Sequence, residues 1–183
     1  NYNLDIDKLG LMGESAGAQI ALMLALQNEV TNNGHPLKLD YLVDIYGPTS
    51  LYALYEQHQQ IIGNVEGILD YLPQGISSNF DFVEQLFGFD PRIDSLTTRA
   101  FTELYSPINY MSDKLPPSLI IHGNTDRLVP NIQSQLLINA MEQNGIYYEY
   151  HELEKCDHAF IGLDRTQRAN VQNWIVQFIF DHS

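Results

Sequence analysis

Short apolar runs alternate with helical patterns along much of the chain. Lys8 to Gly13 is a short apolar run that passes directly into Ser15 to Val30, where apolar residues recur at helical spacings. Leu39 to Tyr46 is a second apolar run, and Gly47-Pro48 terminates it. We interpret this part of the chain as a strand, a tight turn, a helix and a second strand.

The last third of the chain repeats the alternation. Ser118 to His122 is an apolar run followed by a polar loop, and Asn131 to Asn144 reads as a helix that Gly145 stops. A further run, Ile146 to Leu153, comes next, and an amphipathic helix over Arg165 to Phe180 closes the chain. Because strands that alternate with helices form covered parallel sheets, we predict an α/β fold, a parallel sheet with helices on both faces.

Residues from about 51 to 98 interrupt this rhythm. Helical patches such as Phe82 to Phe87 are mixed there with Pro73, Gly75 and Pro91. We predict a helical, cap-like insertion above the sheet, within one domain over residues 1–183. The aromatic side chains of the insertion either form the core of a small cap or line a substrate pocket. These residues are Tyr52, Tyr55, Tyr71, Phe80, Phe82, Phe87 and Phe89.

Composition and charge narrow the classes of function. A chain of 183 residues with 44% apolar residues is long enough for one domain with a sizeable core. Its net charge of -14 repels phosphate backbones and anionic lipid, so we expect no nucleic-acid partner. No apolar run approaches the roughly 20 residues of a membrane span.

A single cysteine, Cys156, cannot form an internal disulfide, and no Cys/His spacing indicates a zinc site, so we expect neither a metal nor a cofactor. The compartment is open, with the cytoplasm favoured.

One motif carries a candidate nucleophile. The segment from Gly13 to Gly17, GESAG, matches G-x-S-x-G, in which a sharp strand-to-helix turn holds a serine hydroxyl clear of the sheet. The motif lies between an apolar run and a helical pattern, as that turn requires. A helix N-cap serine is the alternative, but it does not explain two flanking glycines. We predict Ser15 as the nucleophile and the backbone N–H of Ala16 as an oxyanion-hole donor.

A serine nucleophile needs a histidine base, and six histidines compete for that role. Only His158 occupies a loop between a strand and a helix, where a sheet presents functional groups at its carboxyl edge. We therefore predict His158 as the base. His122, at the end of a strand, is as readily a packing or loop-fixing residue as a chemical one. The other histidines are expected elsewhere: His151 inside a strand, and His35, His58 and His182 at the solvated surface.

The acid that orients the base is expected at the same sheet edge. Asp126 follows the third apolar run, which places it beside His158, and we predict it as the acid. Asp157 is adjacent to His158 in sequence and is expected to cap or fix the loop instead, while Asp113 precedes its strand and belongs to the wrong edge. The resulting order of serine, aspartate and histidine is that of α/β-hydrolases.

The motifs together resemble those of a known family. GESAGA, HGNTDRLVP and CDHAF, with the pair Ser106-Pro107, are similar to the C-terminal part of α/β-hydrolase esterases of the hormone-sensitive-lipase-like and BD-FAE-like group. By that resemblance Ser15, Asp126 and His158 form a triad that transfers an acyl group to water through an acyl-serine intermediate. The implied substrate is a small ester with a short acyl chain, and no cofactor is implied. Ala18 departs from a glycine that members often carry there.

The resemblance also implies a segment that this sequence does not contain. Members carry a His-Gly-Gly loop upstream of the nucleophile strand, which supplies further oxyanion-hole donors, and this sequence begins at Asn1 without one. We therefore expect an N-terminally truncated hydrolase domain, and slower ester hydrolysis by residues 1–183 alone than by a longer protein. We also expect Lys8 to Gly13 to form an apolar sheet edge that a second copy would cover, which makes a homo-oligomer one expectation.

Three other readings remain open. Serine peptidases of the prolyl-oligopeptidase type share the fold and the triad order, but their elbow usually has an aromatic residue where this sequence has Ala16. Carboxylesterases of the cholinesterase type share GESAG, but usually use glutamate as the acid and are far longer. A non-catalytic hydrolase-like module tends to lose a triad member, whereas all three are present here. Short fatty acyl esters, acetylated sugars and feruloyl esters fit the sequence equally well.

Overall fold

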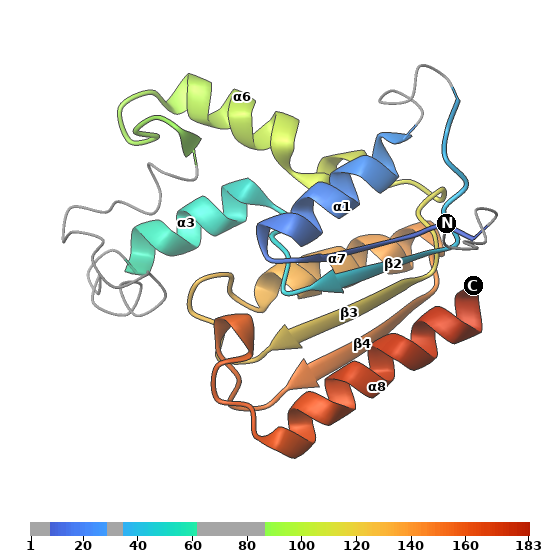
Figure 1. The fold of residues 1–183 in the computed structure, drawn as a ribbon. Coiled ribbons are helices and arrows are strands. Elements are labelled where there is room, and N and C mark those ends of the chain that lie inside the picture. Colours follow the sequence, from blue (N-terminus) through green and yellow to red (C-terminus); the bar gives the residue numbers. More distant parts are fainter. Residues whose placement is uncertain (1–7, 29–34, 62–86) are drawn as a thin grey trace, which may run out of the picture.

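The computed structural model describes residues 8–28, 35–61 and 87–183. Four strands form one sheet in the order β1-β2-β3-β4, and every neighbouring pair is parallel (Figure 1). The strands are β1 (Gly10–Glu14), β2 (Tyr41–Ile45), β3 (Ser118–Gly123) and β4 (Tyr148–Leu153). The predicted parallel sheet is confirmed. The predicted strands began up to two residues earlier than the observed ones, because apolar residues also precede a buried strand in the sequence.

Helices cover both faces of this sheet, as predicted (Figure 1). On one face lie α1 (Ala16–Leu26) and α7 (Ile132–Asn144), whose side chains pack with Leu42 of β2 and Ile120 of β3. On the opposite face lies α8 (Arg165–His182), which packs Phe178 into a second core. Alternate residues of the central strands supply the two cores, as the two-residue period of a strand requires.

Among the described residues, two helices and a short 3-10 helix stand between β2 and β3. They are α3 (Leu51–Ile61), α6 (Ser95–Tyr105) and the 3-10 helix η2 (Pro107–Tyr110). In Figure 1, α3 and α6 lie beyond α1, on the side of the sheet where the strands end. The predicted insertion is therefore helical at residues 51–61 and from residue 95 onward, and α6 continues past the predicted boundary at residue 98. Residues 62–86 of the insertion lie outside the described part of the chain. Asp94 caps α6 by accepting hydrogen bonds from two N–H groups of its first turn.

The described aromatic residues of this segment pack mainly against one another. Phe87 contacts the rings of Tyr55 and Phe101, with centroids 5.6 and 5.1 Å apart, and Phe89 joins the same cluster. This arrangement favours the interpretation of these residues as the core of a small cap, whereas Tyr52 is about half exposed. The other predicted members, Tyr71, Phe80 and Phe82, lie outside the described residues.

Helix α1 buries a different face from the one its large residues suggest. Ala18, Ala21, Leu22 and Ala25 are buried, whereas Ile20 is 68% exposed. The helix lies so close to β1 that mainly small side chains fit between them. The sequence pattern predicted the helix correctly but not its buried face.

The sheet has an edge at β1, which pairs only with β2 among the described residues. Met12 of β1 is more than half exposed. Pairing of this edge with a second copy stays a prediction.

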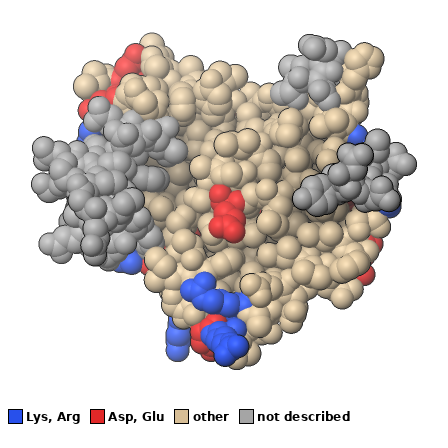
Figure 2. Space-filling model, viewed as in Figure 1, with Lys and Arg blue, Asp and Glu red and all other residues tan. Residues whose placement is uncertain are grey.

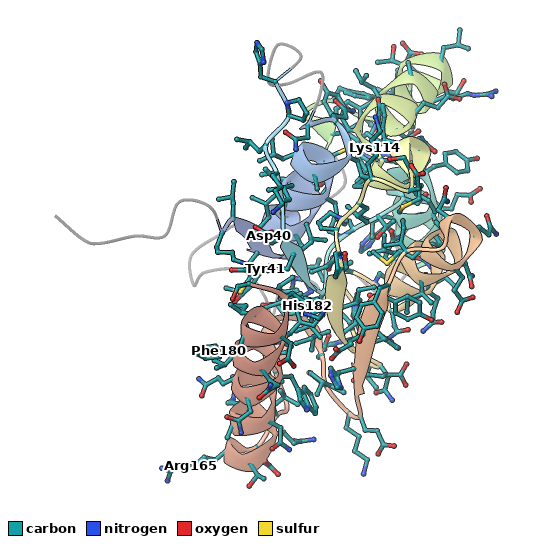
Figure 3. All side chains as sticks on the ribbon, turned by 90° about the vertical axis from the view of Figure 1, so that its right-hand side faces the viewer. Asp40, Tyr41, Lys114, Arg165, Phe180 and His182 are labelled. Atoms are coloured by element: carbon teal, nitrogen blue, oxygen red, sulfur yellow. The ribbon has the colours of Figure 1, made fainter. Side chains whose placement is uncertain are left out.

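On α8, the labelled side chains Arg165 and Phe180 point away from the sheet, and Phe180 is 75% exposed (Figure 3). No helix in the described part of the chain has both the length and the apolar character needed to cross a membrane.

Candidate active site

Ser15 occupies the sharp turn between β1 and α1. Its φ of 53° is in the left-handed region, which is costly for a residue with a side chain, and its N–H donates to the carbonyl of Ile45 at 2.9 Å. Gly13 is needed here, because a Cβ on it would lie 2.2 Å from the carbonyl oxygen of Gly17. A Cβ on Gly17 would meet nothing within 4 Å. The first glycine of the motif is therefore required by packing, and the second is not.

His158 lies at the start of the 3-10 helix η3 (His158–Phe160), in the loop after β4. Its Nε2 is 3.0 Å from Ser15 Oγ, a residue 143 positions earlier in the chain. Its Nδ1 is 2.8 Å from Asp126 Oδ2. The structure thus brings together the three predicted side chains at hydrogen-bond distance. A carboxylate can only accept, so Nδ1 carries the proton and Nε2 is free to accept from the serine hydroxyl.

Asp126 is held by four donors around its two oxygens. Oδ1 accepts from the N–H groups of Leu128 and Val129 at 3.0 and 2.8 Å, while Oδ2 faces His158 and, at 3.4 Å, Nε2 of His122. Burial alone would raise the pKa of this carboxyl, but the bonds from the two histidines and Val129 hold its pKa below the usual value. Asp126 is therefore ionised at neutral pH and can stabilise a protonated His158.

His122 fixes the loop that carries the acid. Its ring is fully buried, with Nε2 2.7 Å from the Val129 carbonyl and Nδ1 2.7 Å from Ser134 Oγ. A carbonyl only accepts, so Nε2 carries a proton, and in the neutral ring Nδ1 accepts from the Ser134 hydroxyl. Of the two roles that the sequence left open for His122, the contacts show the loop-fixing one.

Asp157 links the acid loop to the histidine loop, in agreement with its expected loop-fixing role. Its Oδ1 accepts from the N–H groups of His158 at 2.8 Å and Arg127 at 3.0 Å. Its Oδ2 forms an ion pair with the Arg127 guanidinium at 2.6 Å. One carboxylate therefore holds the backbone of His158 against Arg127, the residue that follows Asp126.

The prediction of a solvated His58 is wrong. This histidine is 1% exposed on α3, and its Nε2 donates to the carbonyl of Leu128 in the acid loop at 2.8 Å. Burial lowers its pKa. The spacing of Leu51, Leu54 and His58 along a helix was the available signal, since all three face inward. His35 is exposed as expected, His182 is half-buried, and His151 stacks on Trp174 of α8 with ring centroids 3.9 Å apart.

The predicted oxyanion donor lies at the start of α1. Ala16 is the first residue of this helix, where backbone N–H groups have no carbonyl one turn earlier to donate to. The positive end of the helix dipole adds to the attraction for a developing negative charge. Figure 2 shows an acidic patch near the centre of the face seen in Figure 1, with mostly uncharged residues around it and a cluster of basic and acidic side chains at the lower end. Within the described residues, no group of three His, Cys, Asp or Glu side chains could hold a metal ion.

The chain is similar to a known protein family and to curated proteins. The BD-FAE family model matches residues 1–141. Esterase LipQ from Mycobacterium tuberculosis (strain ATCC 25618 / H37Rv) is 27% identical over 162 residues, which cover 87% of this chain and 34% of that protein. The chain therefore spans about a third of the length of this curated relative.

Solved structures share the fold at low sequence identity. A truncated form of a carbohydrate esterase from gut microbiota has a TM-score of 0.65 at 19% identity, covering 98% of this chain and 62% of that one. The acylaminoacyl peptidase of Pyrococcus horikoshii has a TM-score of 0.70 at 16% identity, covering 97% of this chain and 24% of that one. At these identities the likeness concerns the fold alone, and the fold is common to an esterase and a peptidase.

Proposed function

This chain belongs to the BD-FAE family and has the α/β-hydrolase fold, and from that membership we propose that it is a serine hydrolase of carboxylic esters. One observation carries the proposal. His158 lies between Ser15 Oγ and Asp126 Oδ2, at 3.0 and 2.8 Å, with the proton on the nitrogen that faces the acid. This arrangement supplies a nucleophile, a base and an ionised group that orients the base.

The first half of the reaction forms an acyl-serine. His158 Nε2 takes the proton of the Ser15 hydroxyl while Oγ attacks the ester carbonyl carbon, and the carbonyl oxygen becomes an oxyanion. In this proposal the N–H of Ala16 donates to that oxyanion, and one such donor typically contributes about 10² to 10³ in kcat. The ionised Asp126 stabilises the imidazolium that forms. The tetrahedral intermediate then breaks its bond to the alkoxide, which takes the proton from Nε2 and leaves as an alcohol.

The second half restores the enzyme. A water molecule donates a proton to His158 Nε2 and attacks the acyl carbon of the acyl-serine. The second tetrahedral intermediate releases Ser15 Oγ, which regains its proton from His158, and the carboxylic acid departs. The same three side chains therefore serve both steps, and no other reactant than water is needed.

An ester fits better than a peptide bond as the substrate. The residue after the nucleophile is Ala16 rather than the aromatic residue usual in prolyl-oligopeptidase-type peptidases, and the matched relative is named an esterase. The shared fold of the acylaminoacyl peptidase keeps peptide hydrolysis as the second candidate. We further propose a preference for short acyl chains, because α3 and α6 with their aromatic cluster stand on the side of the sheet where the strands end.

A panel of chromogenic substrates tests this proposal. We expect kcat/KM to fall in the order p-nitrophenyl acetate or butyrate, p-nitrophenyl dodecanoate, alanyl p-nitroanilide. Ser15→Ala should remove the activity on all of them, while Ser95→Ala, at an exposed serine of α6, should match the wild type. A faster reaction on the anilide would favour the peptidase, and a faster reaction on dodecanoate would favour a lipase. Retention of more than a few per cent of the rate by Ser15→Ala would contradict the mechanism.

A further inference from the structure

Each of the four described strands is followed by a residue that lies at this site. Ser15, Asp126 and His158 follow β1, β3 and β4, and the residue that directly follows β2 is Tyr46. Tyr46 is 4% exposed. The sequence motifs give it no role, and the reaction described above does not use it.

Tyr46 has a backbone conformation that its side chain makes costly. Its φ is 45°, in a region where a bulky residue is strained by about 1–3 kcal/mol. The backbone is held there by a bond from the Tyr46 N–H to the Ile121 carbonyl at 2.9 Å, and by a bond from the Gly47 N–H to Asp44 Oδ1 at 2.9 Å. A glycine would adopt this conformation more easily. The side-chain contacts of Tyr46 must therefore offset the strain.

The hydroxyl of Tyr46 contacts the nucleophile turn. It donates to Oε2 of Glu14 at 2.7 Å, and Glu14 is the residue directly before Ser15. Burial, with the bond to Glu14 and its charge, raises the pKa of Tyr46, so the hydroxyl stays protonated as a donor. Glu14 belongs to an exposed part of β1, which has strand pairing on one side only among the described residues. This bond therefore ties the end of an edge strand to the centre of the sheet.

The ring of Tyr46 contacts the base. Its centroid lies 4.8 Å from that of His158 at an interplanar angle of 62°, and Phe160 packs on it at 5.0 Å and 86°. His158 has to keep Nε2 toward Ser15 and Nδ1 toward Asp126 at the same time. A ring packed against the imidazole opposes any tilt that would lose either bond.

We propose that Tyr46 is a positioning residue that holds Ser15 and His158 in register, through its bond to Glu14 and its ring contact with His158. The proposal rests on the proposed function, since it concerns the geometry of the same reaction. Tyr46 touches neither the substrate nor the reacting atoms in this account. Its contribution is therefore expected in kcat rather than in KM.

Two substitutions separate the two contacts. Tyr46→Phe removes the bond to Glu14 and keeps the ring, so kcat on p-nitrophenyl acetate should fall about three- to tenfold, as expected for one hydrogen bond, with KM unchanged. Tyr46→Leu removes the ring contact as well, and kcat should fall further, on the order of a hundredfold. Tyr41→Phe, at the other end of β2, is the matched control and should retain the wild-type kcat.

A double-mutant cycle shows whether Glu14 and Tyr46 act together. If the hydrogen bond holds the turn, Glu14→Ala should lower kcat as much as Tyr46→Phe does, and the double variant should lower it no further. The burst of p-nitrophenol in the first turnover counts the folded, competent molecules of each variant. Additive losses, a loss confined to KM, or a Tyr46→Phe kcat within twofold of the wild type would overturn the inference. If Ser15→Ala also kept its activity, the proposed function itself would fail, so the two failures are distinguishable.

Discussion

At the scale of single residues, two buried aspartates show how local donors decide a charge state. Asp126 has four donors near its oxygens and is held in the ionised form. Asp44, in β2, is 1% exposed and accepts one bond from the Gly47 N–H, while its other oxygen has no hydrogen-bond partner among the described residues. Burial, only partly opposed by that bond, raises the pKa of Asp44 from 3.8 to about 6. Hydrogen-bond donors therefore stabilise the carboxylate form of Asp126, whereas Asp44 has too few donors to offset its burial.

The raised pKa of Asp44 predicts that the free energy of unfolding of this protein depends on pH. Its folded-state pKa lies above 3.8, so the folded protein binds this proton more tightly than the unfolded chain does. Its contribution to stability is complete below about pH 4 and is lost as the pH rises through about 6. Above that pH the ionised carboxylate disfavours folding by up to about 3 kcal/mol.

Asp44→Asn should remove this effect, because the amide oxygen can still accept from the Gly47 N–H and carries no charge. We expect the variant to melt at a higher temperature than the wild type at pH 7 and at nearly the same temperature at pH 4. Thermal unfolding followed by circular dichroism at both pH values measures the difference. An equal shift at the two pH values, or a lower melting temperature at pH 7, would show that ionisation of Asp44 is not the cause.

At the scale of elements, backbone strain gathers at the ends of the strands. All five non-glycine residues with positive φ in the described part of the chain lie in turns that follow β1, β2 or β4: Ser15, Tyr46, Lys155, Ala159 and Phe160. Strained backbone persists only where the surroundings hold it, and it is concentrated at functional sites. The parallel sheet supplies that support, because a ladder of hydrogen bonds fixes each strand up to its last residue.

The glycines of the nucleophile turn give a prediction at this scale. Gly13→Ala would place a Cβ 2.2 Å from the Gly17 carbonyl oxygen, a backbone atom that cannot move without displacing α1. We expect a loss of about 3 kcal/mol in the free energy of unfolding. Gly17→Ala is the matched control, since its Cβ meets nothing within 4 Å and alanine is favoured in a helix by up to about 1 kcal/mol.

Urea denaturation of the two variants measures both effects. If Gly13→Ala were as stable as the wild type, the close approach of β1 and α1 would not be a constraint of the fold. A destabilised Gly17→Ala would show that the second glycine has a packing role that the contacts do not reveal.

Some features of the fold and of the site follow from the sequence, and others depend on packing between distant elements. Short apolar runs that alternate with helical patterns predicted the parallel sheet and its helices, because each element has to bury its apolar residues. Motif and strand order were enough to select Ser15, Asp126 and His158, which the structure brings together. The burial of His58 and the inward face of α1 were missed, because they depend on how closely other elements pack there. Tyr46 was missed for a further reason, since one tyrosine after a strand matches no motif.

At the scale of the whole molecule, the site depends on both layers of the fold. Ser15 is carried by β1 and α1, which belong to the core on one face, while the loop of His158 leads from β4 into α8, which belongs to the core on the other face. The two residues are 143 positions apart, and the sheet connects them. The relative placement of Ser15 and His158 therefore depends on the whole four-stranded sheet, and not on any local segment.

The central claim is that Ser15 is a nucleophile activated by His158. Reaction with a fluorophosphonate, followed by intact-protein and peptide mass spectrometry, tests this claim most directly, because the reagent traps a serine that an adjacent base has activated. We predict one adduct per molecule on the peptide that contains Ser15, no adduct in Ser15→Ala, and labelling of His158→Ala slower by on the order of 10³ or more. An adduct on another serine, or labelling of His158→Ala at the wild-type rate, would contradict the account.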